Sequence, residues 1–123
     1  MRILSTKTHG VLDYLVGALL IVAPYLFGFA NGGPAQWVPM ALGATTIVYS
    51  LLTDYELSIA RMVPFPVHLA LDGVSALLLL ASPWLFGFAG QVRWPHVGVA
   101  ILEIVVTLLT RTHSPRKLAS RPV

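Results

Sequence analysis

Two histidine–aspartate pairs are the residues of this sequence best suited to chemistry. His9 and Asp13 stand four positions apart, and His68 and Asp72 repeat that spacing. Residues four apart share one face of a helix, so each imidazole can pair with its own carboxylate. Each aspartate would also favour the positive N-terminal end of a helix. In this interpretation the pairs are structural and help to set how deeply a helix sits in a membrane.

A second interpretation needs the two pairs to meet. Two imidazoles and two carboxylates could then bind a divalent cation such as Zn²⁺. Four ligands drawn from two such pairs match no specific metal signature, so we expect no bound metal. A proton relay or a contact to a ligand is the third interpretation of these four residues.

Glu103 is a further chemical candidate, because it lies in an otherwise apolar stretch about seven residues from its end. A carboxylate at that depth of a membrane costs about 2–3 kcal/mol even on lenient insertion scales. It should therefore face the interior of a bundle and be hydrogen-bonded, with Ser75 at similar depth as a partner, or be protonated. Small and hydroxyl residues share its helix face, which permits close helix packing or a proton or cation path. They are Ala100, Thr107 and Thr110, with counterparts Gly43, Ser50 and Thr53, and Thr46 is the counterpart of Glu103.

The composition places these residues in a membrane. Of 123 residues, 56% are hydrophobic and 11% charged, against roughly a quarter charged in soluble domains. A soluble chain of this size could not cover several helices that are apolar on all sides, whereas lipid can. The net charge of +3 is scattered, which argues against nucleic acid as a partner, and the chain has no cysteine.

Four apolar stretches are candidates for membrane-spanning helices: residues 8–29, 37–53, 67–88 and 94–110. Asp13 interrupts the first, and the third copies it in mid-chain, so the first is not a signal peptide. Between the second and third stretches, residues 54–66 mix apolar and polar side chains and predict a short helix on the inner surface. Residues 113–123 form a basic tail.

Lysine and arginine predict the orientation. If both termini face the cytoplasm, the outer loops hold only Arg93. The inner segments hold the other seven basic residues: Arg2, Lys7, Arg61, Arg111, Arg116, Lys117 and Arg121. This asymmetry indicates that both termini lie inside.

The chain contains an internal repeat. Ala-Pro-Tyr-Leu-Phe-Gly-Phe-Ala at 23–30 returns as Ser-Pro-Trp-Leu-Phe-Gly-Phe-Ala at 82–89, and the His/Asp pairs follow the same offset of 59. Trp37 matches Trp94 at an offset of 57. Repeat one covers about 8–55 and repeat two about 67–112. Each is a helical hairpin, and two parallel hairpins are related by a pseudo-two-fold axis along the membrane normal.

The repeated motif predicts helix ends at one membrane interface. Proline should kink or end each helix, near Ala23 in the first copy, glycine permits a turn, and aromatic rings favour the interface. Anchoring is the structural interpretation, and a groove for a quinone, sterol or lipid is the alternative. The motif residues are Pro24, Tyr25 and Gly28 in one copy and Ser82, Pro83, Trp84 and Gly87 in the other.

These paired motifs, the His-x-x-x-Asp ahead of each and Thr53-Asp54-Tyr55-Glu56 between them resemble the SPW-repeat family of small prokaryotic membrane proteins. The resemblance covers His9 to Thr110, although Ala23-Pro24-Tyr25 replaces Ser-Pro-Trp in the first copy. It implies a four-helix membrane protein in two repeats and brings no established activity.

The sequence therefore predicts an all-α, four-helix transmembrane bundle in a single domain over 1–123, in the cytoplasmic membrane. No phosphate-binding loop, nucleophile elbow or HExxH motif is present, so we expect neither an enzyme nor a cofactor. We expect a non-enzymatic module that binds or assembles with other membrane components, in contact with lipid and with itself or another membrane protein. The alternative is a proton- or cation-handling protein that uses Glu103 and the paired His/Asp residues.

Overall fold

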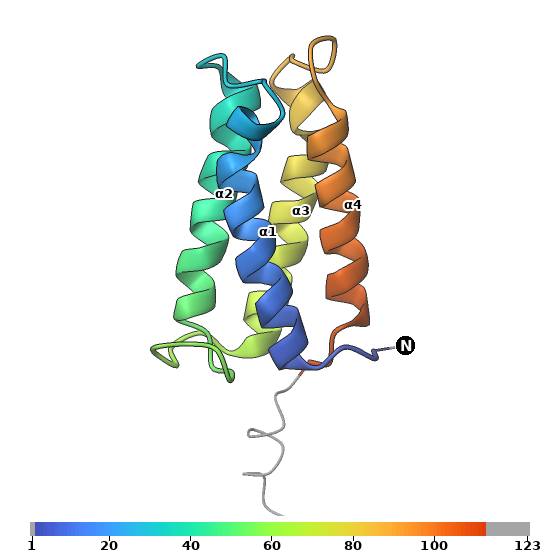
Figure 1. The fold of residues 1–123 in the computed structure, drawn as a ribbon. Helices are drawn as coiled ribbons and strands as arrows, with labels where there is room; N and C mark the ends of the chain where they lie inside the picture. Colours follow the sequence, from blue (N-terminus) through green and yellow to red (C-terminus); the bar gives the residue numbers. More distant parts are fainter. Residues whose placement is uncertain (1, 113–123) are drawn as a thin grey trace, which may run out of the picture.

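Four helices lie side by side in one bundle (Figure 1). The computed structural model describes residues 2–112. The helices are α1 (Thr6–Leu26), α2 (Pro34–Leu51), α3 (Phe65–Leu85) and α4 (Trp94–Leu109), and the described residues form no strand. The predicted all-α four-helix bundle is confirmed, and each helix matches one of the predicted apolar stretches.

The bundle has two distinct ends (Figure 1). Residues 27–33 and 86–93 connect the helices of each hairpin at one end, which we call the hairpin end. Residues 2–5, the connection between α2 and α3, and the end of α4 lie at the other, which we call the terminal end. The two ends differ in how their backbone hydrogen bonds are completed.

At the hairpin end, the repeated motif forms a helix cap. Gly28 has φ 75°, and the N–H of Phe29 bonds to the carbonyl of Pro24 at 2.8 Å. This is the Schellman arrangement, in which a left-handed residue lets the chain turn back on the last helical carbonyls. The second copy repeats it with Gly87 at φ 76° and a 2.7 Å bond from Phe88 to Pro83.

The prolines of the motif stand inside the helices rather than at their ends. We expected a kink or a helix end near Ala23; the helix does not end there, because α1 continues to Leu26. Proline has no N–H, so Pro83 leaves the carbonyl of Leu79 without its usual helical donor. The hydroxyl of Ser82 donates to that carbonyl at 2.7 Å, a bond that Ala23 cannot make in the first copy.

At the terminal end, the two repeats exchange backbone hydrogen bonds. Leu4 bonds through its N–H to Leu109 and through its carbonyl to Arg111, both at 2.8 Å. The equivalent bonds join Val63 to Leu52 and Asp54 at 2.8 and 2.7 Å. Each segment that precedes a first helix thus pairs with the end of the second helix of the other repeat. The two sets of bonds are equivalent under the pseudo-two-fold relation between the repeats.

The predicted surface helix within 54–66 is wrong, because the structure has turns and extended chain from 54 to 64. The carbonyls of Leu51 and Leu52 each accept two N–H groups from residues 59–63, at 2.8–3.1 Å. A helix end leaves such carbonyls without partners. The connection folds back to satisfy them, which is incompatible with a helix of its own.

A small apolar core joins the helices above the terminal end. Gly17 and Gly43 let α1 and α2 approach closely, since a Cβ at Gly43 would lie 2.5 Å from the carbonyl oxygen of Gly17. The core residues are Val16, Leu20, Val38, Leu79 and Ala100. This core separates the polar residues of the terminal half from the hairpin end.

The outside of the bundle is apolar. Large hydrophobic side chains are exposed on every helix, among them Leu15, Val48, Val74 and Leu108, at 57–65% of their surface. α1 and α3 are each long and apolar enough to cross a membrane, and α4 is apolar but shorter. These features fit a membrane protein, because lipid covers apolar side chains that would otherwise face water.

We predict that Ser82→Ala destabilises the protein by about 1–2 kcal/mol, since it leaves a buried carbonyl without a donor. The free energy of unfolding in detergent micelles measures this. Ser50→Ala is the matched control, because Ser50 is equally buried and its Oγ has no hydrogen-bond partner within residues 2–112. Equal effects of the two substitutions would contradict the role given to Ser82.

Candidate functional site

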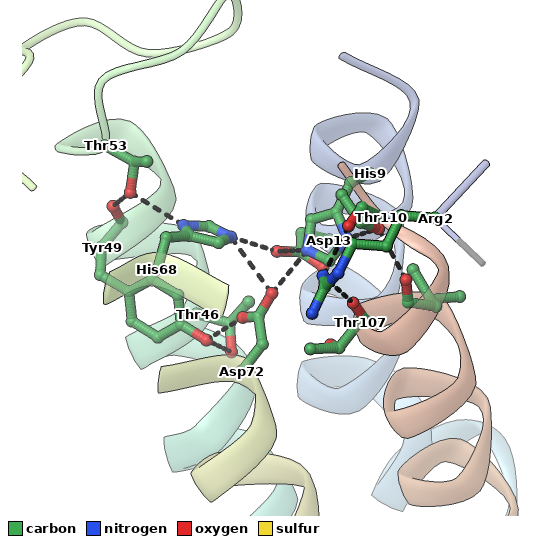
Figure 2. Close-up of polar contacts among 11 residues, drawn as sticks. Arg2, His9, Asp13, Thr46, Tyr49, Thr53, His68, Asp72, Thr107 and Thr110 are labelled. Carbon is green, nitrogen blue, oxygen red and sulfur yellow. Dashed lines mark hydrogen bonds and ion pairs between the residues drawn. The ribbon is translucent and has the colours of Figure 1, made fainter. Parts of the chain in front are cut away.

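The two His/Asp pairs meet inside the bundle near its terminal end (Figure 2). His9 and Asp13 extend from α1, His68 and Asp72 from α3, and none is more than 2% exposed. We call these four residues the His/Asp cluster. The two-fold relation between the repeats turns the same face of α1 and α3 toward the bundle axis, which brings the two pairs together.

Each imidazole contacts both carboxylates through Nε2. Nε2 of His9 lies 2.6 Å from Oδ2 of Asp72 and 3.0 Å from Oδ2 of Asp13. Nε2 of His68 lies 2.7 Å from Oδ2 of Asp13 and 3.2 Å from Oδ2 of Asp72. The shorter contact of each histidine is to the other repeat. The cluster is thus a ring of alternating nitrogen and oxygen atoms that joins α1 to α3.

The second nitrogen of each imidazole faces a threonine. Nδ1 of His68 lies 2.8 Å from Oγ1 of Thr53, and Nδ1 of His9 lies 2.7 Å from Oγ1 of Thr110. Both hydroxyls donate to the carbonyl four residues earlier in the chain, at 2.6 Å. A hydroxyl has one hydrogen, so each threonine must accept at its histidine. Both Nδ1 atoms therefore carry a proton.

This assignment determines the charge of the cluster. With Nδ1 protonated, a bare Nε2 would turn its lone pair toward carboxylate oxygens, which repel it. A proton shared between nitrogen and oxygen removes the repulsion, and so does a metal cation. Two protons or one divalent cation both give the cluster a net charge of zero. Neutrality matters because an unpaired charge is costly to bury.

The outer carboxylate oxygens break the symmetry. The hydroxyl of Tyr49 donates to Oδ1 of Asp72 and lies 3.4 Å from Oγ1 of Thr46. Val106 occupies the position equivalent to Tyr49 and has no donor. Oδ1 of Asp13 is buried and has no hydrogen-bond partner among the described residues. One aspartate is therefore fully bonded, whereas the other retains an oxygen that can accept a further bond.

Glu103 lies beside a small cavity that continues from the cluster. It is 7% exposed on α4, so it faces the interior as predicted. The cavity has a volume of about 20 Å³, enough for about one water molecule. Oε1 of Glu103 is without a partner in residues 2–112, so it does not form the expected bond to Ser75. The polar side chains lining the cavity are Glu103, Ser75, Thr46, Tyr49 and Asp72.

Aromatic rings cover the cluster at the terminal end. Phe65 stacks on His68 with ring centroids 5.2 Å apart and meets His9 edge-on at 5.8 Å. Tyr55, in the connection between α2 and α3, is 2% exposed and lies 5.7 Å from His68. Burial, with a smaller contribution from Tyr14, raises the pKa of Tyr55 above its usual value. A neutral aromatic cover separates the cluster from the surface.

The structure divides the residues singled out from the sequence into two groups. The His/Asp pairs, Glu103, Thr46 and Ser75 lie in or next to the cluster. The repeated motif lies at the hairpin end, where Tyr25 and Trp84 are 63% and 60% exposed. Gly28, Gly87 and the motif prolines form the caps described above.

Sequence reasoning missed Tyr49 and Tyr55. Tyr49 stands three residues after Thr46 and four before Thr53, so it shares the polar face of its helix. That spacing could have identified Tyr49 as a residue of the polar face. No comparable periodicity marks Tyr55, whose burial depends on how the connection folds.

We predict that Tyr49→Phe lowers the free energy of unfolding by about 1.5–3 kcal/mol, because Asp72 loses its hydrogen bond from a neutral donor. Denaturant titration in detergent micelles measures the change. Tyr25→Phe removes the same hydroxyl from an exposed ring and should change the free energy by less than about 0.5 kcal/mol. A Tyr49→Phe protein as stable as Tyr25→Phe would show that Asp72 does not depend on this bond.

Comparison with protein families matches residues 7–110 to the SPW repeat domain. Searches of curated proteins and of solved structures found no match. The matched region contains both His/Asp pairs, both copies of the motif and nearly all of the four helices. The chain therefore belongs to the SPW repeat family.

Proposed function

We propose that the chain crosses the cytoplasmic membrane four times, with the terminal end of the bundle in the cytoplasm. The distribution of basic residues supports this orientation. Of those in the described segments, Arg2, Lys7, Arg61 and Arg111 lie at or next to the terminal end, whereas Arg93 lies at the hairpin end. Basic residues are enriched on the cytoplasmic side of membrane proteins.

Single-cysteine labelling tests this topology, since the natural chain has no cysteine. Asn31→Cys and Gln91→Cys, both exposed at the hairpin end, should react with a membrane-impermeant maleimide in intact spheroplasts. Ile59→Cys, which is exposed at the terminal end, should react only after the membrane is opened. Labelling of Ile59→Cys in intact spheroplasts, or of only one hairpin loop, would contradict four spans with both termini inside.

We propose that this membrane protein is a non-enzymatic cation-binding protein whose His/Asp cluster exchanges two protons for one divalent cation. The proposal rests on one observation. Each Nδ1 atom is hydrogen-bonded to a threonine hydroxyl, so both Nε2 atoms face the two carboxylates. The exchange preserves the zero net charge of the cluster. A buried site can then release or take up the cation without exposing an uncompensated charge to lipid.

The donor set favours a borderline metal. The four candidate ligand atoms lie within 4.8 Å of one another, and imidazole with carboxylate suits Zn²⁺ and related ions. Histidine ligands usually donate their other N–H to a fixed acceptor, which holds the ring in place. Thr53 and Thr110 provide that acceptor here.

The apolar core favours cation binding over cation conduction through the bundle. Beyond Glu103 the core toward the hairpin end is apolar, with Leu20, Leu79 and Ala100 buried. Glu103 extends the polar region by one cavity, so we assign it to relaying protons between the cluster and that cavity when a cation enters or leaves. The sequence favoured an assembly module. Association with itself or another membrane protein remains a proposal, because the exposed apolar side chains can equally contact lipid.

Cobalt binding tests the proposed function. Protein purified in detergent should bind one Co²⁺ with the absorption bands of a four-coordinate ion, release two protons into weakly buffered solution, and lose the bands when Zn²⁺ is added. His68→Gln should abolish the bands. Thr53→Val should weaken binding by about 10–100-fold, since it removes the partner that orients the ring.

His96→Gln is the matched control, because His96 is also buried but lies outside the cluster. It should bind Co²⁺ like the natural protein. Circular dichroism establishes that each variant retains its helices. If the natural protein does not bind Co²⁺, or if His68→Gln binds it equally well, the cluster does not bind a cation and serves only to connect α1 and α3.

A further inference from the structure

One contact between aromatic rings at the hairpin end is not shared by the two repeats. Trp37 and Phe86 meet edge-on with ring centroids 5.7 Å apart, and they join α2 to the end of α3. The repeat offsets match these rings to Trp94 and Phe27, which form no ring pair within residues 2–112. Trp94 is 70% exposed, against 49% for Trp37. The pair of rings that joins α2 to α3 is therefore missing between α4 and α1.

An apolar pocket lies at this position, between α1, α2 and α4. Its volume is about 430 Å³, within the range of small-molecule sites. The buried residues Leu20, Ala23 and Pro39 line it, together with the exposed Phe27 and Trp94. A pocket with a buried floor and an exposed rim opens to the outside of the bundle, which is its apolar surface.

The pocket runs along the bundle axis. Its lining residues extend from Leu19 to Phe27 along α1 and from Trp94 to Leu102 along α4. Each of these stretches rises by about 12 Å, and half of the hydrocarbon core of a bilayer is about 15 Å thick. The pocket therefore has the direction and roughly the length of an acyl chain in one leaflet.

The walls of the pocket suit an apolar occupant. Of the lining side chains, only those of His96 and Trp94 have a hydrogen-bonding group. Nε2 of His96 donates to the carbonyl of Ala35 at 2.9 Å, because Pro39 lacks the N–H that would bond to it. Nδ1 of His96 is buried, out of reach of an occupant. A hydrocarbon chain needs no polar partner and fits such walls.

A single positive charge lies beside the pocket. The guanidinium carbon of Arg93 is 5.7 Å from the ring centroid of Trp94, which lines the pocket. One nitrogen of Arg93, Nη1, donates to the carbonyl of Ala89 at 3.3 Å. The sequence has no acidic residue in 14–53 or in 73–102. No carboxylate side chain of these ranges can therefore neutralise Arg93, and its charge is complementary to an anion.

We infer that the pocket holds one acyl chain of a phospholipid, whose phosphate group binds the guanidinium of Arg93. The chain enters from the side, between α1 and α4, where the aromatic pair is missing. The phosphate supplies the negative charge that this half of the bundle lacks, and guanidinium N–H groups bind phosphate oxygens strongly. The inference rests on the membrane location of the bundle and is independent of cation binding at the His/Asp cluster.

A matched pair of lipids tests this inference: phosphatidylglycerol, and the diacylglycerol with the same chains, which lacks the phosphate. Native mass spectrometry of delipidated protein in detergent counts the bound molecules and measures both dissociation constants. We expect one phosphatidylglycerol per chain, bound about tenfold more tightly than the diacylglycerol. Inorganic phosphate should not displace it, because the chain contributes to binding.

Two variants separate the charge from the pocket. Arg93→Gln should reduce the affinity ratio of the two lipids to about one, whereas Arg61→Gln, at an exposed arginine of the terminal end, should leave it unchanged. Gly98→Leu should weaken both lipids, because Gly98 lines the pocket and a Cβ there meets no atom within 4 Å. Gly73→Leu is its control, since Gly73 is equally free of close contacts and lies outside the pocket.

Brominated chains locate the bound lipid. Trp94 and Trp37 are equivalent positions of the two repeats, and of these two only Trp94 lines the pocket. Two proteins each retain one of them, with phenylalanine at the other two tryptophan positions. In nanodiscs that contain phosphatidylglycerol with brominated chains, the fluorescence of Trp94 should be quenched at a lower fraction of brominated lipid than that of Trp37.

Any of the following results would overturn the inference. Equal affinity for the two lipids, or an unchanged ratio in Arg93→Gln, would mean that Arg93 binds no phosphate. Equal effects of Gly98→Leu and Gly73→Leu, or equal quenching of the two tryptophans, would place the lipid on the general apolar surface. Displacement by inorganic phosphate would indicate an anion site that needs no acyl chain. Arg93 is exposed, so Arg93→Gln tests the charge without removing a core residue.

Discussion

The structure depends on one ring of contacts in which two buried imidazoles and two buried carboxylates neutralise each other's charge and satisfy each other's hydrogen bonds. Burying any one of these groups charged and alone would cost more than most single interactions in a small protein provide. Each Nε2 has two carboxylate oxygens near it, and each Nδ1 has a threonine. The threonine hydroxyls in turn donate to backbone carbonyls of α2 and α4. All four helices are thereby connected through one polar centre.

Missing backbone donors explain several side chains that would otherwise look arbitrary. A proline inside a helix leaves one carbonyl without its N–H partner. Ser82 bonds to the carbonyl released by Pro83, and His96 bonds to the one released by Pro39. The serine of the Ser-Pro-Trp triplet is therefore a structural donor beside its proline. In the first copy Ala23 stands at this position, so Pro24 has no serine donor beside it.

Much of this architecture could be predicted from the sequence. The apolar stretches identified the helices, and the repeat offsets identified the parallel hairpins. The cost of placing a carboxylate in a membrane predicted that Glu103 faces inward. The meeting of the two His/Asp pairs was only one of three interpretations, since spacing within a helix does not show which helices face each other. Tyr49 and the fold of residues 54–64 were missed. Both depend on which donors reach particular oxygen atoms, and such pairings between distant segments leave no local pattern.

The exchange of segments at the terminal end bears on how the protein arose. Leu4 and Val63 each complete the hairpin to which they do not belong, so one hairpin alone would lack a partner, and two identical copies could supply each other. Within one chain the two halves need not be identical. Tyr49 and Val106, like Thr46 and Glu103, are matched positions at which the two repeats differ. A dimer of identical halves would have two equivalent carboxylates. In this chain Asp72 accepts a hydrogen bond from Tyr49, whereas Oδ1 of Asp13 has no partner among the described residues and can accept a further bond.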